Sequence, residues 1–428
     1  MTVVATTRMG RWRAALSVLA NRDFALLWVG GGFNSLSRAV LNIAVMKLIY
    51  DQTGSAGGVG LLVFTNIFSM AIVTPVAGVL ADRLDRKKLL IGIGFARALA
   101  AFTFLWAQSS LAIYAVNFAL SVVITLSFPV GSAITPDIVK KEQLLDANAL
   151  GMSLATLAMI LGPLLGGFVM DGFSPQAVFI LSGVLLLLAA LCVLPVRMPP
   201  PSLLRGEASL GAVYEEFVEG VRYARVNPVV SDLTIIYSVM LLGLGLKMGL
   251  DVVFAEQVLS SESLSTSTAY SYMMSASAVG MFLGSVAVRY LGRRWAKKRV
   301  LLLGLGMMGL DALGLAFVRS LLLALGAKLA NGIGWGLSDS LWPTLLQENV
   351  EEDKRGRAFS LFLSVVTVLP AITVYLGGWL ADHTSLGLVY GLAGAWALLA
   401  VIGSRFLSSY RAIPVHAEEG TAMKEGQS

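Results

Sequence analysis

The stretch GVLADRLDRKK, residues 78–88, places a dense cluster of charged residues between two long apolar segments. Residues 59–80 precede the cluster and residues 89–107 follow it. Each segment is long enough to cross about 30 Å of hydrocarbon as an α-helix, which rises about 1.5 Å per residue. The stretch therefore predicts two membrane helices joined by a short basic turn.

The composition indicates a membrane protein. Of the 428 residues, 56% are hydrophobic and 14% are charged, whereas an average soluble protein has about 25% charged residues. A water-soluble core could not bury so much apolar surface. The formal net charge of +6 does not indicate nucleic-acid binding, because the basic residues recur in short loops between apolar segments rather than on one exposed domain.

Twelve apolar segments predict an all-α integral membrane protein. Most of the 32 Lys and Arg residues fall in alternate loops and in the terminal tails. The positive-inside rule places these loops and both termini in the cytoplasm of a multi-pass inner-membrane protein. The predicted transmembrane helices are 24–49, 59–80, 89–107, 111–134, 147–170, 177–196, 230–257, 267–289, 300–318, 321–345, 358–381 and 386–408.

A long polar interruption divides the apolar segments into two halves. The halves share a motif, LGGFVMD at 165–171 and LGGWLAD at 376–382, so two six-helix pseudo-repeats are expected. The predicted domains are a cytoplasmic tail at 1–23, a six-helix bundle at 24–196, a cytoplasmic linker at 197–229, a second bundle at 230–408 and a cytoplasmic tail at 409–428.

The pattern Gly-x-x-x-Asp-Arg-x-x-Arg-Lys-Lys at 78–88 resembles the signature loop of the major facilitator superfamily, with Asp85 where that family usually has glycine. With NRDFALLW at 21–28, YDQTGSA at 50–56 and DANAL at 146–150, the chain resembles the macrolide-efflux and siderophore-export branch of the drug:proton antiporters. The resemblance implies a twelve-helix major facilitator fold that works by alternating access.

The resemblance also implies that the basic loop is a conformational latch that holds the cytoplasmic side shut. The Asp82 carboxylate can accept hydrogen bonds at a helix N-terminus, and the arginines can pair with carboxylates or lipid phosphate. A plain stop signal for membrane insertion is the simpler interpretation, but it requires only bases and does not explain the acid. The predicted latch residues are Gly78, Asp82, Arg83, Arg86, Lys87 and Lys88.

A second motif lies in the fifth segment. The sequence GPLLGG at 162–167 resembles the antiporter motif of the superfamily, with Ala158 in place of its leading glycine. Close helix packing through small residues and a proline bend is an equally good interpretation. The motif residues are Gly162, Pro163, Gly166 and Gly167.

Polar residues inside the apolar segments indicate a substrate path, because exposing them to lipid is costly. Residues 34, 38 and 42 recur at i, i+4 spacing and form a polar stripe on the first segment. Arg38 is expected either to bind an anionic group of the substrate or to pair with an acid on another helix. The predicted substrate-binding residues are Asn34, Arg38, Asn42, Lys328, Asn331, Trp335 and Trp342.

Proton coupling requires an acid inside the membrane. Relatives commonly carry one near the position of Arg38, and this chain does not. Asp339 is the first choice, because it shares a helix face with Lys328 and two tryptophans, although a fixed Lys–Asp bridge is an equal alternative. The predicted proton-coupling residues are Asp339, Asp251, Glu256 and Asp311.

Three further interpretations concern charges inside the segments. Lys247 and Asp251 lie one helical turn apart, which predicts that they neutralise each other. Asp311 is expected to be either a partner for a neighbouring helix or a proton carrier. Arg97 is expected to be structural.

The sequence gives no indication of an enzyme, a cofactor or a metal site. The single cysteine, Cys192, cannot form a disulfide within the chain. The two histidines, His383 and His416, offer few ligands for a metal ion. GLGMMG at 304–309 matches a dinucleotide-binding fingerprint but lies inside an apolar segment. No Gly-Lys pair occurs, which excludes a phosphate-binding loop.

These observations predict a monomeric secondary transporter. Its expected activity is the export of a small amphiphilic compound, such as a drug, macrolide or siderophore, driven by an ion gradient, for which protons are the first choice. Its partners are the substrate, protons and the lipid bilayer. The alternatives are an importer or lysolipid transporter of the same fold, since a fold does not set direction, and an intramembrane transferase.

Overall fold

The computed structural model describes residues 17–83, 85–198, 210–261 and 264–406. Within these ranges the regular secondary structure is helical, apart from one isolated bridge between Ser261 and Leu264. The α-helices are α2 (Arg22–Thr53), α3 (Ala56–Arg83), α4 (Arg86–Thr103), α5 (Ser110–Ile138), α6 (Leu144–Gly172), α7 (Pro175–Val193), α8 (Leu210–Val226), α9 (Pro228–Gly245), α10 (Asp251–Phe254), α11 (Thr266–Arg294), α12 (Lys297–Leu315), α13 (Leu321–Asn349), α14 (Arg355–His383) and α15 (Leu386–Gly403).

The predicted fold class is confirmed. In the described part of the chain, 10 helices are long and apolar enough to cross a membrane. The other two predicted segments are occupied by α2 and α12. The seventh segment is divided into α9, α10 and a π-helical turn, Ala255–Leu259.

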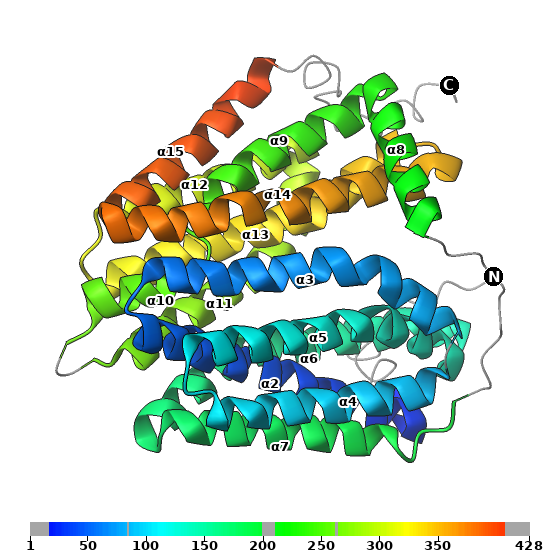
Figure 1. Cartoon of the computed structure of the whole chain (residues 1–428). Coiled ribbons are helices and arrows are strands. Elements are labelled where there is room, and N and C mark those ends of the chain that lie inside the picture. The colour runs from blue at the N-terminus through cyan, green and yellow to red at the C-terminus, as the bar shows by residue number, and fades with distance from the viewer. Residues whose placement is uncertain (1–16, 84, 199–209, 262–263, 407–428) are drawn as a thin grey trace, which may run out of the picture. The chain divides into compact units, whose positions relative to one another are not determined.

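The first compact unit comprises Met1–Thr53 and Phe68–Leu210. Within it, α2 packs against α6 and α7, and α4 packs against α5 and α7 (Figure 1). The side chains of α2 that face this packing are small or aliphatic, among them Val40, Ile43 and Ala44, which are almost fully buried. The polar stripe of α2 lies on a different face.

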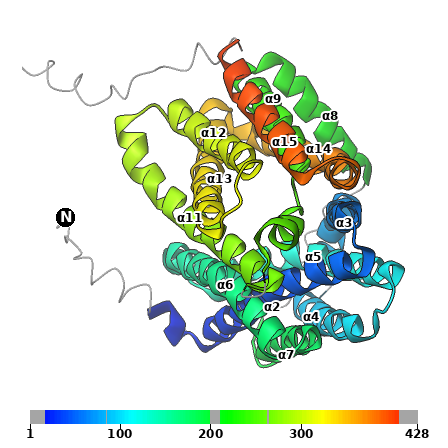
Figure 2. The ribbon, with the colours of Figure 1, turned by 90° about the vertical axis from the view of Figure 1, so that its left-hand side faces the viewer.

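The second compact unit comprises Gly54–Ile67 and Gly211–Ser428. Within it, α11 packs against α13, α12 against α13 and α15, and α9 against α14 and α15 (Figure 2). The unit includes the start of α3, which the sequence assigns to the first bundle. It also includes most of α8, which lies in the predicted linker and is joined to α14 by an ion pair between Glu219 and Arg357. The predicted domain boundaries remain predictions.

Several membrane helices begin at a serine or asparagine that caps the free N–H groups of the first turn. Ser109, Ser174, Ser265 and Ser385 each accept a hydrogen bond from the backbone N–H three residues later. Asn227 accepts from two N–H groups at the start of α9. These caps fix where the chain turns back into the bilayer.

The shared LGG motif forms a close helix contact in each unit. Gly166 of α6 lies against the backbone of Val40 in α2. Its counterpart in the second repeat, Gly377 of α14, lies so close to the Leu246 carbonyl that a Cβ atom at this position would overlap it. Glycine at these two positions therefore allows each helix to pack directly against the neighbouring backbone.

The aspartate that ends the second copy of the motif caps the start of α3. The Asp382 carboxylate accepts hydrogen bonds from the N–H groups of Ala56, at 2.7 Å, and Gly57, at 2.9 Å. The Ser55 hydroxyl donates to the same carboxylate. A carboxylate at this place satisfies N–H groups that the helix itself leaves free and complements the positive end of the helix dipole.

Candidate transport site

The seventh span is broken in its middle, and the break positions two charged residues. Helix α9 ends at Gly245 and α10 begins at Asp251. Between them the chain forms turns, with Gly249 in the left-handed region at φ 88°, a conformation that glycine adopts at little cost. Lys247 lies in the break and Asp251 at its end. Irregular backbone in a membrane helix is tolerated where it is buried in protein or lines a cavity.

A buried charge cluster, which we define as Lys247, Asp251, Asp311 and Lys328, lies around this break. Lys247 pairs with Asp311 of α12. The Lys328 ammonium of α13 is 2.6 Å from the Asp251 carboxylate and 4.0 Å from that of Asp311. The Tyr390 hydroxyl of α15 donates to Asp251 over 2.8 Å. The cluster therefore joins the broken span to three other helices of the second unit.

The buried charge cluster is electrically balanced, with two ammonium and two carboxylate groups. Its side chains are largely removed from solvent, at 9% exposure for Lys247, 0% for Asp311 and 3% for Lys328. Asp251 is the most accessible member, at 19%. Such burial is tolerated only because each charge has an opposite charge nearby.

The observed pairs differ from the local pairing that the sequence predicts. Lys247 and Asp251 were expected to neutralise each other along one helix, and this prediction is wrong, because Lys247 pairs with Asp311 and Asp251 with Lys328. The break in the helix removes the regular i, i+4 geometry on which the prediction depends. Of the two expectations for Asp311, the partnership with a neighbouring helix is the one observed.

The predicted array on α13 divides into a buried and an exposed part. Lys328 and Asn331 are buried, whereas Trp335 and Asp339 are exposed. The expected bridge between Asp339 and Lys328 is not formed, because Lys328 pairs with Asp251. Asp339 instead accepts a hydrogen bond from the indole N–H of Trp342, over 3.3 Å.

Two aromatic residues, Trp342 and Tyr270, have further interactions in this unit. Trp342 stacks on Phe362 of α14, with ring centroids 4.4 Å apart. Tyr270 of α11 is buried and lies within electrostatic range of Asp251. Sequence reasoning missed Tyr270 and Tyr390. The only available signal was a hydroxyl group in an apolar segment, and that signal does not identify a partner.

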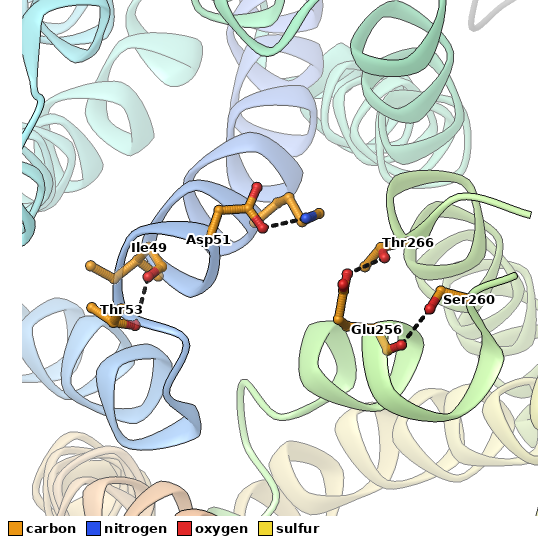
Figure 3. Close-up of polar contacts among 7 residues, drawn as sticks. Ile49, Asp51, Thr53, Glu256, Ser260 and Thr266 are labelled. Carbon is orange, nitrogen blue, oxygen red and sulfur yellow. Dashed lines mark hydrogen bonds and ion pairs between the residues drawn. The ribbon is translucent and has the colours of Figure 1, made fainter. Parts of the chain in front are cut away.

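Glu256, the remaining candidate for proton coupling, lies in the π-helical turn after α10. The Thr266 hydroxyl at the start of α11 donates to its carboxylate, and the Ser260 hydroxyl donates to its backbone carbonyl (Figure 3). These contacts tie together the connection between α10 and α11. Glu256 therefore lies at the end of its span, apart from the buried charge cluster.

The polar stripe of the first unit lies on α2. Arg38 and Asn42 are exposed and Asn34 is partly exposed. On the neighbouring face, the Ser37 hydroxyl donates to the Ser182 carbonyl of α7 over 3.0 Å. Near the end of α2, Lys47 pairs with Asp51, which Figure 3 also shows.

The predicted latch is described only in part. Gly78, Asp82 and Arg83 belong to the last turns of α3, and their side chains lie outside the described residues. Asp85 caps α4 by accepting from the Lys88 N–H over 3.0 Å. Arg86 pairs with Asp137 of α5 at 2.8 Å. The latch function itself, including the role of Lys87, remains a prediction.

The antiporter-like motif of α6 lies in a close helix interface. Gly162, Pro163, Gly166 and Gly167 are all buried. Gly162 faces Ala39 and the Leu36 carbonyl of α2. This geometry is that of small-residue packing between membrane helices, while a role in exchange remains a prediction.

The sequence matches the family described as Major Facilitator Superfamily over residues 27–257 and 247–426. It is 23% identical to macrolide efflux protein A of Streptococcus pyogenes, over 91% of this chain and 96% of that protein. It is 27% identical to the enterobactin exporter EntS of Shigella boydii, over 86% and 88% of the two chains.

Solved transporters share the fold. The nucleoside transporter NupG superposes with a TM-score of 0.73 at 14% identity, covering 90% of this chain and 98% of its own. A bacterial homologue of the human lysosomal transporter Spinster, in an inward-facing and unoccupied conformation, gives a TM-score of 0.67 at 14% identity, over 94% and 96%. The family match covers nearly the whole chain and agrees with the helical architecture, so this protein is a transporter of the major facilitator superfamily.

Proposed function

We propose that this transporter exports a small amphiphilic compound from the cytoplasm in exchange for protons, and that Asp251 is the residue that binds the proton. The buried charge cluster carries the proposal. A proton-coupled carrier requires an acid that reaches water in part of the cycle and whose charge affects helix packing. Asp251 combines partial exposure with contacts to two other helices through Lys328 and Tyr390.

Protonation of Asp251 would change the balance of the cluster. Neutral Asp251 attracts Lys328 less strongly, and the nearest remaining carboxylate is that of Asp311, 4.0 Å from the Lys328 ammonium. The Asp311 carboxylate would then be the only charged partner of both lysines in the cluster, and its attraction for Lys328 would draw α13 towards α12. The titratable groups that face Asp251 come from its own broken span and from four other helices, and they are Lys247, Asp311, Lys328, Tyr270 and Tyr390.

The names of two relatives support export as the direction of transport. Macrolide efflux protein A and the enterobactin exporter are named for export. The proposal includes cytoplasmic termini and a functional monomer. Asp339 remains a second candidate for the proton-binding acid, because it is exposed and on a membrane helix, where an exposed carboxylate requires water.

The test uses the full-length protein in proteoliposomes. Counterflow of erythromycin, a catecholate siderophore and a lysophospholipid would first identify a transported compound. An imposed pH gradient should then drive its accumulation by the wild-type protein. Asp251→Asn should abolish accumulation driven by the gradient but preserve counterflow, because exchange of substrate does not require net proton movement.

Asp339→Asn tests the second candidate, since it removes an acid of the same kind from outside the buried charge cluster. It should retain accumulation driven by the pH gradient. If Asp339→Asn loses this accumulation and Asp251→Asn keeps it, the proton site belongs on α13 instead. Accumulation of the lysophospholipid alone, or accumulation in the direction of import, would favour the alternative functions.

A further inference from the structure

The first unit carries charge inside the membrane that none of its own spans neutralises. The six predicted spans between residues 24 and 196 contain no Asp or Glu. They contain three cations, Arg38, Lys47 and Arg97. Lys47 pairs with Asp51 near the end of α2. Arg38 and Arg97 both lie near the middle of their helices, and the spans of this unit contain no acid that could neutralise them.

Arg97 of α4 is a buried cation. Its side chain is only 5% exposed, and its Nε atom has no hydrogen-bond partner among the residues that the structure describes. The charge that acts on it most strongly is the like charge of Arg38. A buried guanidinium in such surroundings is costly unless an anion compensates it.

Unlike Arg97, Arg38 can be reached by a ligand, because its side chain is exposed. It is exposed on the polar stripe of α2, and in the described ranges no ion pair includes it. A guanidinium at mid-span does not face lipid cheaply, so this side of α2 must meet water or a polar ligand during transport. Two guanidinium groups within electrostatic range of each other create a region of positive potential open to that side.

We propose that Arg38 and Arg97 form a binding site for an anionic group, a carboxylate, catecholate or phosphate, carried by the amphiphilic substrate. Arg38 is the contacting group, because its fork of N–H donors matches such oxygens in pairs. Arg97 does not contact the anion but adds to the positive potential at the site. The bound anion in turn lowers the free-energy cost of burying the Arg97 guanidinium. The inference deepens the proposed function by assigning the substrate a negative charge.

The test measures binding and needs neither a pH gradient nor transport. Full-length protein in nanodiscs of zwitterionic lipid is titrated with pyrenebutyrate, which is anionic, and with pyrenebutanol, which is neutral but otherwise similar. The wild type should bind the anion about tenfold more tightly than the alcohol, a difference of about 1.4 kcal/mol. Arg38→Gln should remove this preference while affinity for the alcohol stays the same.

Arg97→Gln should weaken the anion's binding by a smaller factor, about threefold, since Arg97 acts at longer range. Arg97→Lys keeps the charge and should retain the preference, which provides a second variant if Arg97→Gln does not fold. Lys47→Gln is the matched control, because it removes a cation from α2 that already has its own acid. Its preference for the anion should equal that of the wild type.

The proposal would be overturned if the wild type bound both probes equally, or if Arg38→Gln lost affinity for both to the same extent. Loss of the preference in Lys47→Gln would also contradict it. Adding anionic phosphatidylglycerol to the nanodiscs tests the source of the ligand. Strong competition by this lipid would support the anion site and identify a lipid headgroup as its occupant.

This test is separate from that of the proposed function. Anion binding without export would refute the proposed function alone, and export without a preference for the anion would refute this site alone.

Discussion

The two units neutralise the charges within their membrane spans differently. In the second unit, Lys247 and Lys328 are matched by Asp251 and Asp311, and all four side chains contact a partner of opposite charge. In the first unit, the spans hold two arginines and no acid with which to pair them. A repeated fold can therefore assign different tasks to its halves. A balanced cluster suits the movement of a proton, whereas an excess of positive charge suits the binding of an anion.

The largest expected effect comes from unbalancing the second unit. Asp311→Asn leaves Lys247 without its partner although its side chain is only 9% exposed, which should cost about 3–5 kcal/mol of stability. Thermal unfolding in detergent, followed by tryptophan fluorescence, measures the loss. The double variant Lys247→Met with Asp311→Leu should recover most of it. A double variant as unstable as the single one would mean that the two residues contribute through more than their charges.

A second comparison uses the LGG motif that the halves share. Gly377→Ala places a methyl group on the Leu246 carbonyl and should cost about 1–3 kcal/mol as an overpacked contact. Gly166→Ala meets the Val40 carbonyl at 3.2 Å, so a small shift relieves it and the cost should be lower. The same unfolding assay ranks the two variants. Equal effects would show that the closer packing of the second unit can relax.

The charge of the first unit can be changed by adding the acid that it lacks. Asn34→Asp places a carboxylate one helical turn before Arg38, where it can form a local ion pair. The preference for pyrenebutyrate over pyrenebutanol should fall by about tenfold, or about 1.4 kcal/mol. Lys47→Gln, a change on the same helix but outside the predicted binding residues, is again the control and should leave it unaltered. An undiminished preference in Asn34→Asp would argue against Arg38 as the contact.

The smallest effect is expected for an ion pair at the end of the first unit. Arg86 and Asp137 are 2.8 Å apart, but their side chains remain 24% and 36% exposed. Asp137→Asn should therefore cost less than about 1 kcal/mol, because solvent screens the pair. Set beside Asp311→Asn, this variant isolates the effect of burial on the loss of one carboxylate. A loss as large as that of Asp311→Asn would show that the pair holds α4 and α5 together.

The sequence was sufficient to predict the twelve helical segments and the family, because long apolar segments and basic loops are local signals. It also identified Lys247, Asp251, Asp311 and Lys328 as charged residues inside the membrane. It could not predict their partners. That Lys328 pairs with Asp251 rather than Asp339 depends on the break after Gly245 and on helix packing, neither of which is encoded in spacing along one helix. The sequence shows directly that the predicted spans of the first half contain no acids. That this leaves a buried cation uncompensated could be seen only from the burial of Arg97 in the structure.

The exchange of partners in the second unit has a consequence for biogenesis. When the ribosome delivers Lys247 and Asp251 to the membrane, Asp311 and Lys328 have not yet been synthesised. Each charge alone costs about 2.5–3.5 kcal/mol at the centre of an inserting helix. Their spacing of four residues allows the two to neutralise each other if the segment enters as a continuous helix. The local pairing that the finished protein lacks would thus suit insertion, and the observed pairs become possible only after α12 and α13 have been synthesised.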